Sequence, residues 1–252
     1  MPDSGDCGRY NGPVKRFVGP FSDGHYEPWC TQCRRNHKEE YRSIYDAWVK
    51  SHAEGLLASM KVPQVYRSCS LESFEANTQE QERALQAAQE WLTSDLPGLF
   101  LCGSCGTGKT HLAIGALLAM RARRHSGRFV SATELLFEFR NSFRGGDGPE
   151  ELINKYCEAD VLLLDDLGAE RPTEFSRETL GLVIDRVYRQ ESCLIVTSNF
   201  DLSGIAERID NRTADRLIDM CRAVRLSGDS FRQKRAVERA QLRSLSASKQ
   251  VQ

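Results

Sequence analysis

The stretch "GSCGTGKT", residues 103–110, constrains the fold of this chain most strongly. It fits the pattern G-x-x-x-x-G-K-[ST], in which glycines let backbone amides turn toward phosphate oxygens and the lysine meets the terminal phosphates. An apolar run precedes it and a helical pattern follows, as phosphate binding requires, and the alternative is an ordinary strand-to-helix turn. The predicted nucleotide-binding residues are Gly103, Ser104, Cys105, Gly106, Thr107, Gly108, Lys109, Thr110 and His111.

Short apolar runs alternate with amphipathic stretches from about residue 98 onward, which is typical of strands and helices around a parallel sheet. Because residues 161–164 are continuously apolar, their strand should be buried on both faces. We therefore expect an α/β fold of the P-loop NTPase type with a five-stranded parallel sheet. The predicted strands are "GLFLCG" (98–103), "RFVSA" (128–132), "DVLLLDD" (160–166), "CLIVTSN" (193–199) and "AVRLSG" (223–228).

Helix-start signals occur at two places. Ser131 and Glu134 have the spacing of a capping box before a predicted helix at 132–143, and Thr78 and Gln81 have the same spacing before another. The stretch "RGGDGPE" (144–150) is the clearest predicted loop.

Composition excludes some classes of protein. The 252 residues suffice for one domain with a small appendage, and a formal net charge of -1 gives no argument for a polyanionic partner. No segment has the length and apolarity of a signal peptide or a membrane span, so we expect a cytoplasmic protein without membrane contact. The nine cysteines are an odd number, and most are expected to be free thiols.

Polar side chains close two of the predicted strands. Asp165 is predicted to join Thr110 in holding Mg²⁺, and Asp166 to polarise the attacking water. The alternative is that both aspartates only end a strand. Asn199 closes the next strand, where its amide could position water or contact the γ-phosphate, although many strands end in a turn asparagine.

The N-terminal region differs in kind from the rest. In "CTQCRRNH", Cys30 and Cys33 have the spacing of a zinc knuckle, which Cys7 and His37 would complete, with His25 competing for the last position. The alternative is free thiols in a loop-rich segment. The predicted domains are an N-terminal module at 1–60, an ATPase domain at 61–233 and a tail at 234–252.

The order of the motifs resembles a known family. The motifs "GSCGTGKT", "LLLDDLGAE", "IVTSN", "RTADRLIDMC" and "LSGDSFR", preceded by "SLESFEANTQEQERALQAAQEWL", are similar to the DnaC-type helicase loaders and the IstB-type transposition helper ATPases. Both belong to the AAA+ class, and the resemblance covers about residues 62–233. It implies that Asn199 is the sensor-1 residue, that Arg216 is an arginine finger acting in trans, and that Arg232 is the sensor-2 arginine acting in cis.

The resemblance also implies function and partners. It implies an ATPase that uses ATP and Mg²⁺, forms homo-oligomers on ATP binding and loads a replicative hexameric helicase, which residues 1–60 would bind. Asp166 stands where the class usually has glutamate, Cys105 where proline is common, and Tyr10 where such N-terminal modules often have histidine. A transposition helper, a small-molecule P-loop kinase and a nucleotide-binding scaffold without turnover remain alternatives.

A contact with single-stranded DNA has one local candidate. Arg140 and Arg144 flank a glycine-rich bend at the end of the predicted helix 132–143, where a ring of subunits could point them at one strand. The alternative is a solvent-facing helix end.

Overall fold

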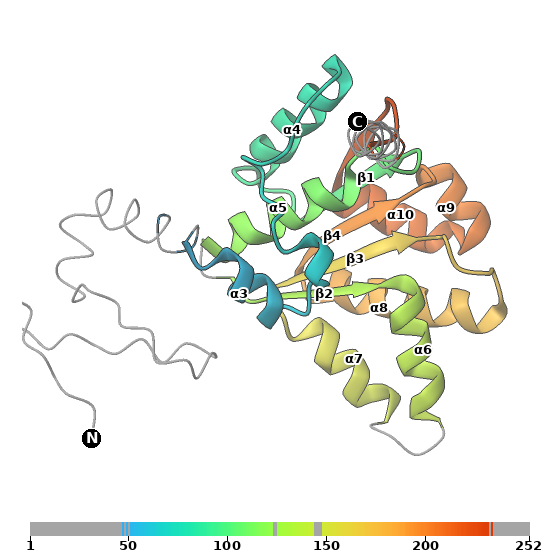
Figure 1. The fold of residues 1–252 in the computed structure, drawn as a ribbon. Helices are drawn as coiled ribbons and strands as arrows, with labels where there is room; N and C mark the ends of the chain where they lie inside the picture. Colours follow the sequence, from blue (N-terminus) through green and yellow to red (C-terminus); the bar gives the residue numbers. More distant parts are fainter. Residues whose placement is uncertain are drawn as a thin grey trace, which may run out of the picture. The chain divides into compact units, whose positions relative to one another are not determined.

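The computed structural model describes residues 51–122, 125–143 and 148–231, together with Ala47, Val49 and Gln233. The chain divides into two compact units, Met1–His52 and Ala53–Gln252. All the helices and strands named below belong to the second unit (Figure 1).

The second unit is built on a five-stranded parallel sheet, as the alternating pattern predicts. The strand order is β2-β3-β4-β1-β5, so the strand that leads into the phosphate loop is covered by a neighbour on each side. Parallel pairing brings the carboxyl ends of all the strands to one edge of the sheet. The strands are β1 (Gly98–Gly103), β2 (Gly127–Ser131), β3 (Val161–Leu167), β4 (Cys193–Ser198) and β5 (Cys221–Leu226).

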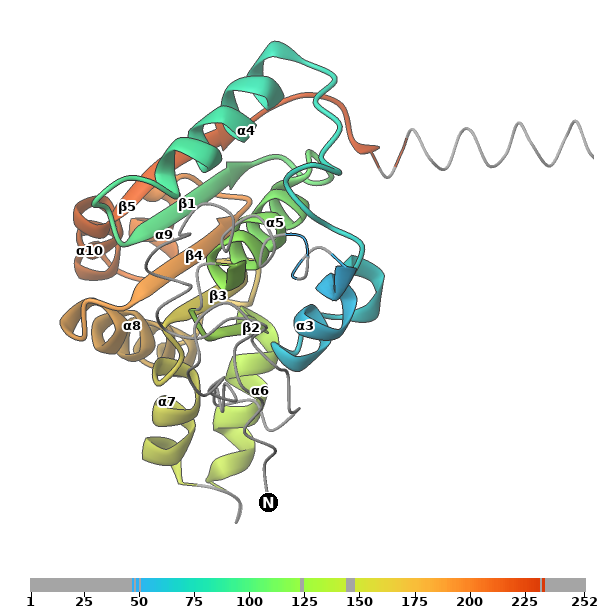
Figure 2. The ribbon, with the colours of Figure 1, turned by 90° about the vertical axis from the view of Figure 1, so that its left-hand side faces the viewer.

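Helices cover both faces of the sheet (Figures 1 and 2). Helix α5 packs on one face and contacts α3 and α4, whereas α6, α7, α8 and α10 pack on the other. No helix in the described part of the chain is long and apolar enough to cross a membrane. The helices are α3 (Ala53–Ser59), the short 3-10 helix η1 (Gln64–Tyr66), α4 (Gln79–Trp91), α5 (Lys109–Ala122), α6 (Ala132–Ser142), α7 (Pro149–Cys157), α8 (Glu174–Arg189), α9 (Leu202–Arg208) and α10 (Asn211–Met220).

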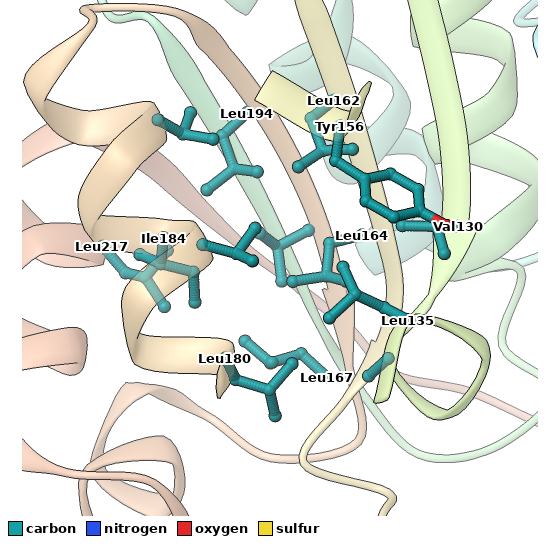
Figure 3. Packing of buried hydrophobic residues seen from close by; sticks show 14 of the residues in the cluster. Val130, Leu135, Tyr156, Leu162, Leu164, Leu167, Leu180, Ile184, Leu194 and Leu217 are labelled. Atoms are coloured by element: carbon teal, nitrogen blue, oxygen red, sulfur yellow. The ribbon is translucent and has the colours of Figure 1, made fainter. Parts of the chain in front are cut away.

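The main core lies between the sheet and the second layer of helices (Figure 3). Leu162 and Leu164 of β3 belong to this core, as do Leu180 and Ile184 of α8. The first five residues of β3 are buried, which confirms the prediction of a strand covered on both faces.

Two local predictions have different outcomes. The capping box of Ser131 and Glu134 is confirmed at the start of α6. The predicted loop at 144–150 is wrong at its end, because Pro149 and Glu150 form the first turn of α7. Proline fits this position because its fixed φ suits a helix and the first turn needs no N–H donor from it.

Candidate nucleotide-binding site

The phosphate loop depends on three glycines with positive φ. Gly103, Gly106 and Gly108 have φ values of 143°, 81° and 100°, a region that residues with a Cβ rarely adopt. An added Cβ would overlap the Leu226 carbonyl at Gly103 and the Ser230 side chain at Gly106. The loop therefore needs these glycines both for its backbone path and for its close contacts.

Lys109 begins α5 and is 5% exposed. Its Nζ donates hydrogen bonds to the carbonyls of Gly103 (2.9 Å) and Ser104 (2.8 Å) and to Oδ1 of Asn199 (2.9 Å). The structure thus brings together two predicted site residues, one at the start of α5 and one just after β4. The shared carboxyl edge of the sheet places them side by side although 90 residues separate them.

Asp165 lies near the carboxyl end of β3 and is 4% exposed. Its Oδ1 accepts hydrogen bonds from the hydroxyls of Thr110 (3.0 Å) and Thr197 (2.6 Å). Burial raises the pKa of this carboxyl, and the neighbouring charge of Asp166 raises it further, while the two hydroxyls and Lys109 act in the opposite direction. The ionised carboxylate is therefore poorly solvated unless a cation lies beside it.

The oxygen atoms of Thr110 and Asp165 fit a magnesium ion that arrives with a nucleotide. Mg²⁺ prefers oxygen ligands and usually keeps water and phosphate oxygens in its shell, so one hydroxyl and one carboxylate suffice from the protein. Within the described ranges, no group of three or more His, Cys, Asp or Glu side chains could hold a metal ion by itself.

Asp166 occupies an unusual backbone position. Its φ is 55°, and the pairing of β3 with β4 shifts register between Leu164 and Leu167. Its N–H donates to Oγ1 of Thr197 (2.9 Å), so Thr197 contacts both acidic residues. Sequence reasoning missed Thr197, although a hydroxyl two positions before Asn199 near the end of a buried strand was the available signal.

The connector between α3 and α4 contacts the phosphate loop. An added Cβ at Gly108 would lie 2.7 Å from the ring of Phe74, and this ring meets the His111 ring edge-on with centroids 5.4 Å apart. The side chain of Gln81 donates to the Thr107 carbonyl (3.3 Å). Sequence reasoning did not include Phe74 and Gln81 in the site because such contacts are not visible in local spacing.

The start of α4 has the spacing of a capping box but only one of its two hydrogen bonds. Thr78 caps α4 by accepting from the Gln81 N–H, as predicted. The Oε1 atom of Gln81 accepts instead from the N–H of Asn77 (2.9 Å), and its Nε2 atom donates to the phosphate loop.

The C-terminal part of the described chain also contacts the phosphate loop. Phe231 donates its N–H to the Gly106 carbonyl (3.0 Å).

Arg216 lies on α10 and contacts α8. Its guanidinium forms an ion pair with Asp185 and lies over the Tyr188 ring, with Cζ 5.7 Å from the ring centroid. These recorded contacts are all with α8, so the structure does not group Arg216 with Lys109 and Asp165 of its own chain.

Other predicted residues fall outside the described residues. These are Arg232, Arg144, His25 and the zinc candidates Cys7, Cys30, Cys33 and His37. Arg140 is described: its guanidinium lies over the Phe175 ring at 5.3 Å, and the exposed Phe143 meets the same ring edge-on at 6.2 Å.

The fold and the site together define a class of protein. A parallel sheet carries a phosphate loop after β1, a buried aspartate at the tip of β3 and an asparagine just after β4. This arrangement is that of a P-loop nucleoside triphosphate-binding protein of the AAA+ class.

Comparison with known families narrows the class. The family of IstB-like ATP-binding proteins matches residues 51–239, so the chain belongs to this family. The resemblance inferred from the motifs is thereby confirmed.

Individual relatives are more distant. The replicative helicase loader DnaC of Buchnera aphidicola subsp. Baizongia pistaciae is 23% identical over 169 residues, which cover 64% of this chain and 68% of that protein. DnaC of Escherichia coli (strain K12) is 21% identical over 157 residues, covering 61% and 64% of the two chains. The match thus spans about two thirds of the length of these curated relatives.

Solved structures share the fold. A crystal structure of the DnaC helicase loader has a TM-score of 0.60 and 25% identity, covering 66% of this chain and all of that one. The crystal structure of DnaI has a TM-score of 0.59 and 24% identity, covering 67% and 96%. A replication initiator DnaA bound to AMPPCP and single-stranded DNA has a TM-score of 0.57 and 24% identity, covering 66% and 51%.

Proposed function

We propose that the chain is an ATPase that binds ATP with Mg²⁺, assembles with a replicative hexameric helicase and single-stranded DNA, and hydrolyses ATP to ADP and phosphate as the releasing step. The observation that carries the ATPase part is the joining of Lys109 to Asn199 and of Thr110 to Asp165 at one edge of the sheet. The loader part is supported by the named relatives, which are helicase loaders.

The proposed roles follow from the chemistry of phosphoryl transfer. Bound Mg²⁺ supplies neutralisation of phosphate charge. Lys109 neutralises the terminal phosphates, while Thr110 and Asp165 hold the metal ion. Asp166 and Asn199 orient the attacking water. As charge develops on the transferred phosphoryl group, Arg216 stabilises it from a neighbouring subunit, and Arg232 does so within the same chain.

The ATPase proposal is tested with Lys109→Ala. Phosphate release from ATP is measured for this variant, for the parent chain and for Lys155→Ala, which changes a surface lysine paired with Glu138. We expect Lys109→Ala to abolish hydrolysis and Lys155→Ala to leave it intact. A parent chain without turnover would indicate a nucleotide-binding scaffold, and phosphate transfer to a small metabolite would indicate a kinase.

A second candidate function is that of a transposition helper, which the IstB-like family match supports. Pull-down with the ATP-bound protein, followed by identification of the retained partner, separates the two. Retention of a replicative helicase supports the loader. Retention of a transposase instead contradicts it.

Single-stranded DNA is proposed to contact the end of α6. Arg140 lies there over the Phe175 ring, Phe143 meets that same ring edge-on, and Phe143 is 67% exposed. Aromatic rings and guanidinium groups are the side chains on which unpaired bases stack. Replacing Arg140 and Arg144 with alanine should lower the DNA-stimulated ATPase rate, and an unchanged rate would remove this proposal.

A further inference from the structure

Helices α8 and α10 run in the same direction and meet along a row of side-chain contacts. At the first contact, Gly181 of α8 lets α10 approach closely: a Cβ added to this glycine would lie 3.3 Å from Oγ1 of Thr213. The last is a hydrogen bond of 2.7 Å from a tyrosine hydroxyl to a carboxylate. Along the row, the contacts join Gly181 to Thr213, Asp185 to Arg216, and Tyr188 to Asp219.

The central contact is an ion pair shielded from water. The side chains of Asp185 and Arg216 are 15% and 13% exposed, and Oδ1 of Asp185 is inaccessible to solvent. Two further arginines reach the same carboxylate from the surface: Arg189 at 2.8 Å and Arg212 at 3.8 Å, with side chains 65% and 70% exposed. Only one of the three arginines is therefore held in the interior part of the contact.

The ion pair fixes a planar group without using all its donors. A guanidinium has five N–H donors, and the pair with Asp185 engages Arg216 through Nη2. The Tyr188 ring lies against one side of the guanidinium. A group held in one orientation before its ligand arrives loses less conformational freedom on binding and needs less rearrangement as charge develops.

We propose that Asp185 is a positioning residue for Arg216: it holds the guanidinium in the orientation that meets the γ-phosphate of ATP bound to a neighbouring copy of this chain. The inference rests on the proposed function, in which Arg216 acts in trans. In this role Asp185 contacts neither the nucleotide nor the attacking water. It influences hydrolysis only by positioning Arg216.

The first experiment compares variants at the carboxylate. Asp185→Ala should lower the rate of ATP hydrolysis about tenfold and leave the affinity for ATP unchanged, because the phosphate loop of the same chain is intact. Asp185→Glu keeps the charge and should recover a substantial part of the rate. Glu90→Ala removes the carboxylate of a surface pair with Arg222 and should leave hydrolysis unchanged.

The second experiment separates positioning from damage to the fold. Lys109→Ala lacks a working phosphate loop but keeps α8 and α10 unaltered. At an interface where an Asp185→Ala chain supplies the phosphate loop and a Lys109→Ala chain supplies the arginine, the site is complete. Mixing the two impaired variants should therefore restore hydrolysis above the sum of their separate rates.

The outcomes distinguish this inference from the proposed function. A fully active Asp185→Ala, or an inactive one that mixing does not restore, overturns the positioning role. Arg216→Ala is treated in parallel: restoration of this variant by Lys109→Ala, without restoration of Asp185→Ala, leaves the trans arginine standing and removes Asp185. Wild-type activity of Arg216→Ala itself contradicts the proposed arginine finger.

Discussion

At the scale of single residues, the buried carboxylate of Asp165 affects both the stability of the fold and the proposed binding of a metal ion. Its burial raises the pKa, so ionisation at neutral pH costs the folded chain free energy that the unfolded chain does not lose. The same poorly solvated charge is what a metal ion bound beside it would compensate. In the proposed site, the capacity to hold a metal ion would thus come at the expense of stability.

Asp165→Asn should therefore stabilise the fold while weakening nucleotide binding with Mg²⁺. An asparagine oxygen can still accept from Thr110 and Thr197 but carries no charge. Because the pKa is raised, the parent chain gains stability as the pH falls through the folded pKa toward the unfolded one, so the difference from the variant should shrink there. Thermal unfolding with EDTA and without nucleotide checks this, with Asp95→Asn as an exposed control. A lower melting temperature for Asp165→Asn at neutral pH contradicts the argument.

Thiol reactivity is also decided residue by residue. Burial raises the pKa of Cys157 to about 11 and of Cys193 to about 12, so both are protonated at pH 8, whereas Cys105 is exposed on the phosphate loop. Among the described cysteines, iodoacetamide should label Cys105 first, and ATP with Mg²⁺ should slow the labelling. Peptide mapping by mass spectrometry follows each site. Labelling of Cys105 at the same rate with and without nucleotide would show that the nucleotide leaves this loop uncovered.

At the scale of elements, sequence periodicity identifies the strands well because burial is repeated locally. β1 is found at the predicted residues, and the other strands differ by one or two residues at their ends. β5 deviates most, since it follows α10 directly, without a turn residue to mark its start. The position of candidate site residues was predictable where they lie at a strand end, as for Asp165 and Asn199. Contacts between distant segments involve Thr197, Phe74 and Asp185, and no local sequence pattern contains such contacts.

The connector before α4 is predicted to depend on a glycine of α5. A Cβ at Gly115 would lie 2.6 Å from the Leu71 nitrogen and 2.8 Å from the Ser70 carbonyl carbon. Gly115→Ala should destabilise the chain by about 1–3 kcal/mol, despite the better helix propensity of alanine, because backbone must move. It should also weaken nucleotide binding by shifting Phe74.

Gly55→Ala is the matched control for this prediction. Gly55 also lies within a helix, α3, but nothing lies within 4 Å of an added Cβ. This substitution should stabilise the chain by roughly 0.5–1 kcal/mol. Urea unfolding measures both variants, and equal effects at the two positions would contradict close packing at Gly115.

At the scale of the whole molecule, truncations can test the boundary between the two compact units. The sequence suggests a module ending at residue 60, whereas the boundary between the two compact units falls between His52 and Ala53 along the chain. The carbonyl of Met60 accepts from the Phe129 N–H of the edge strand β2 (2.8 Å), and Leu57 is fully buried. Residues 53–60 therefore contribute to the stability of the second unit, which carries the phosphate loop.

Two truncations follow from this. A chain lacking residues 1–52 should retain its melting temperature and nucleotide affinity. It should lose capture of the helicase, because the N-terminal module, with its proposed zinc site, is the proposed helicase-binding part. A chain lacking residues 1–60 should unfold at a lower temperature. Calorimetry and nucleotide titration check both variants. Loss of nucleotide binding in the shorter deletion would show that the second unit needs residues 1–52 to bind nucleotide.

The order of strands has a consequence for how the molecule is made. β1 lies between β4 and β5, which the ribosome delivers long after it, and the N–H of Phe231 closes onto Gly106 later still. In a growing polypeptide, the lysine-bearing turn therefore lacks these neighbours until β4, β5 and Phe231 have been synthesised. We expect nascent chains to remain unable to retain ATP until the segment from β5 to Phe231 emerges.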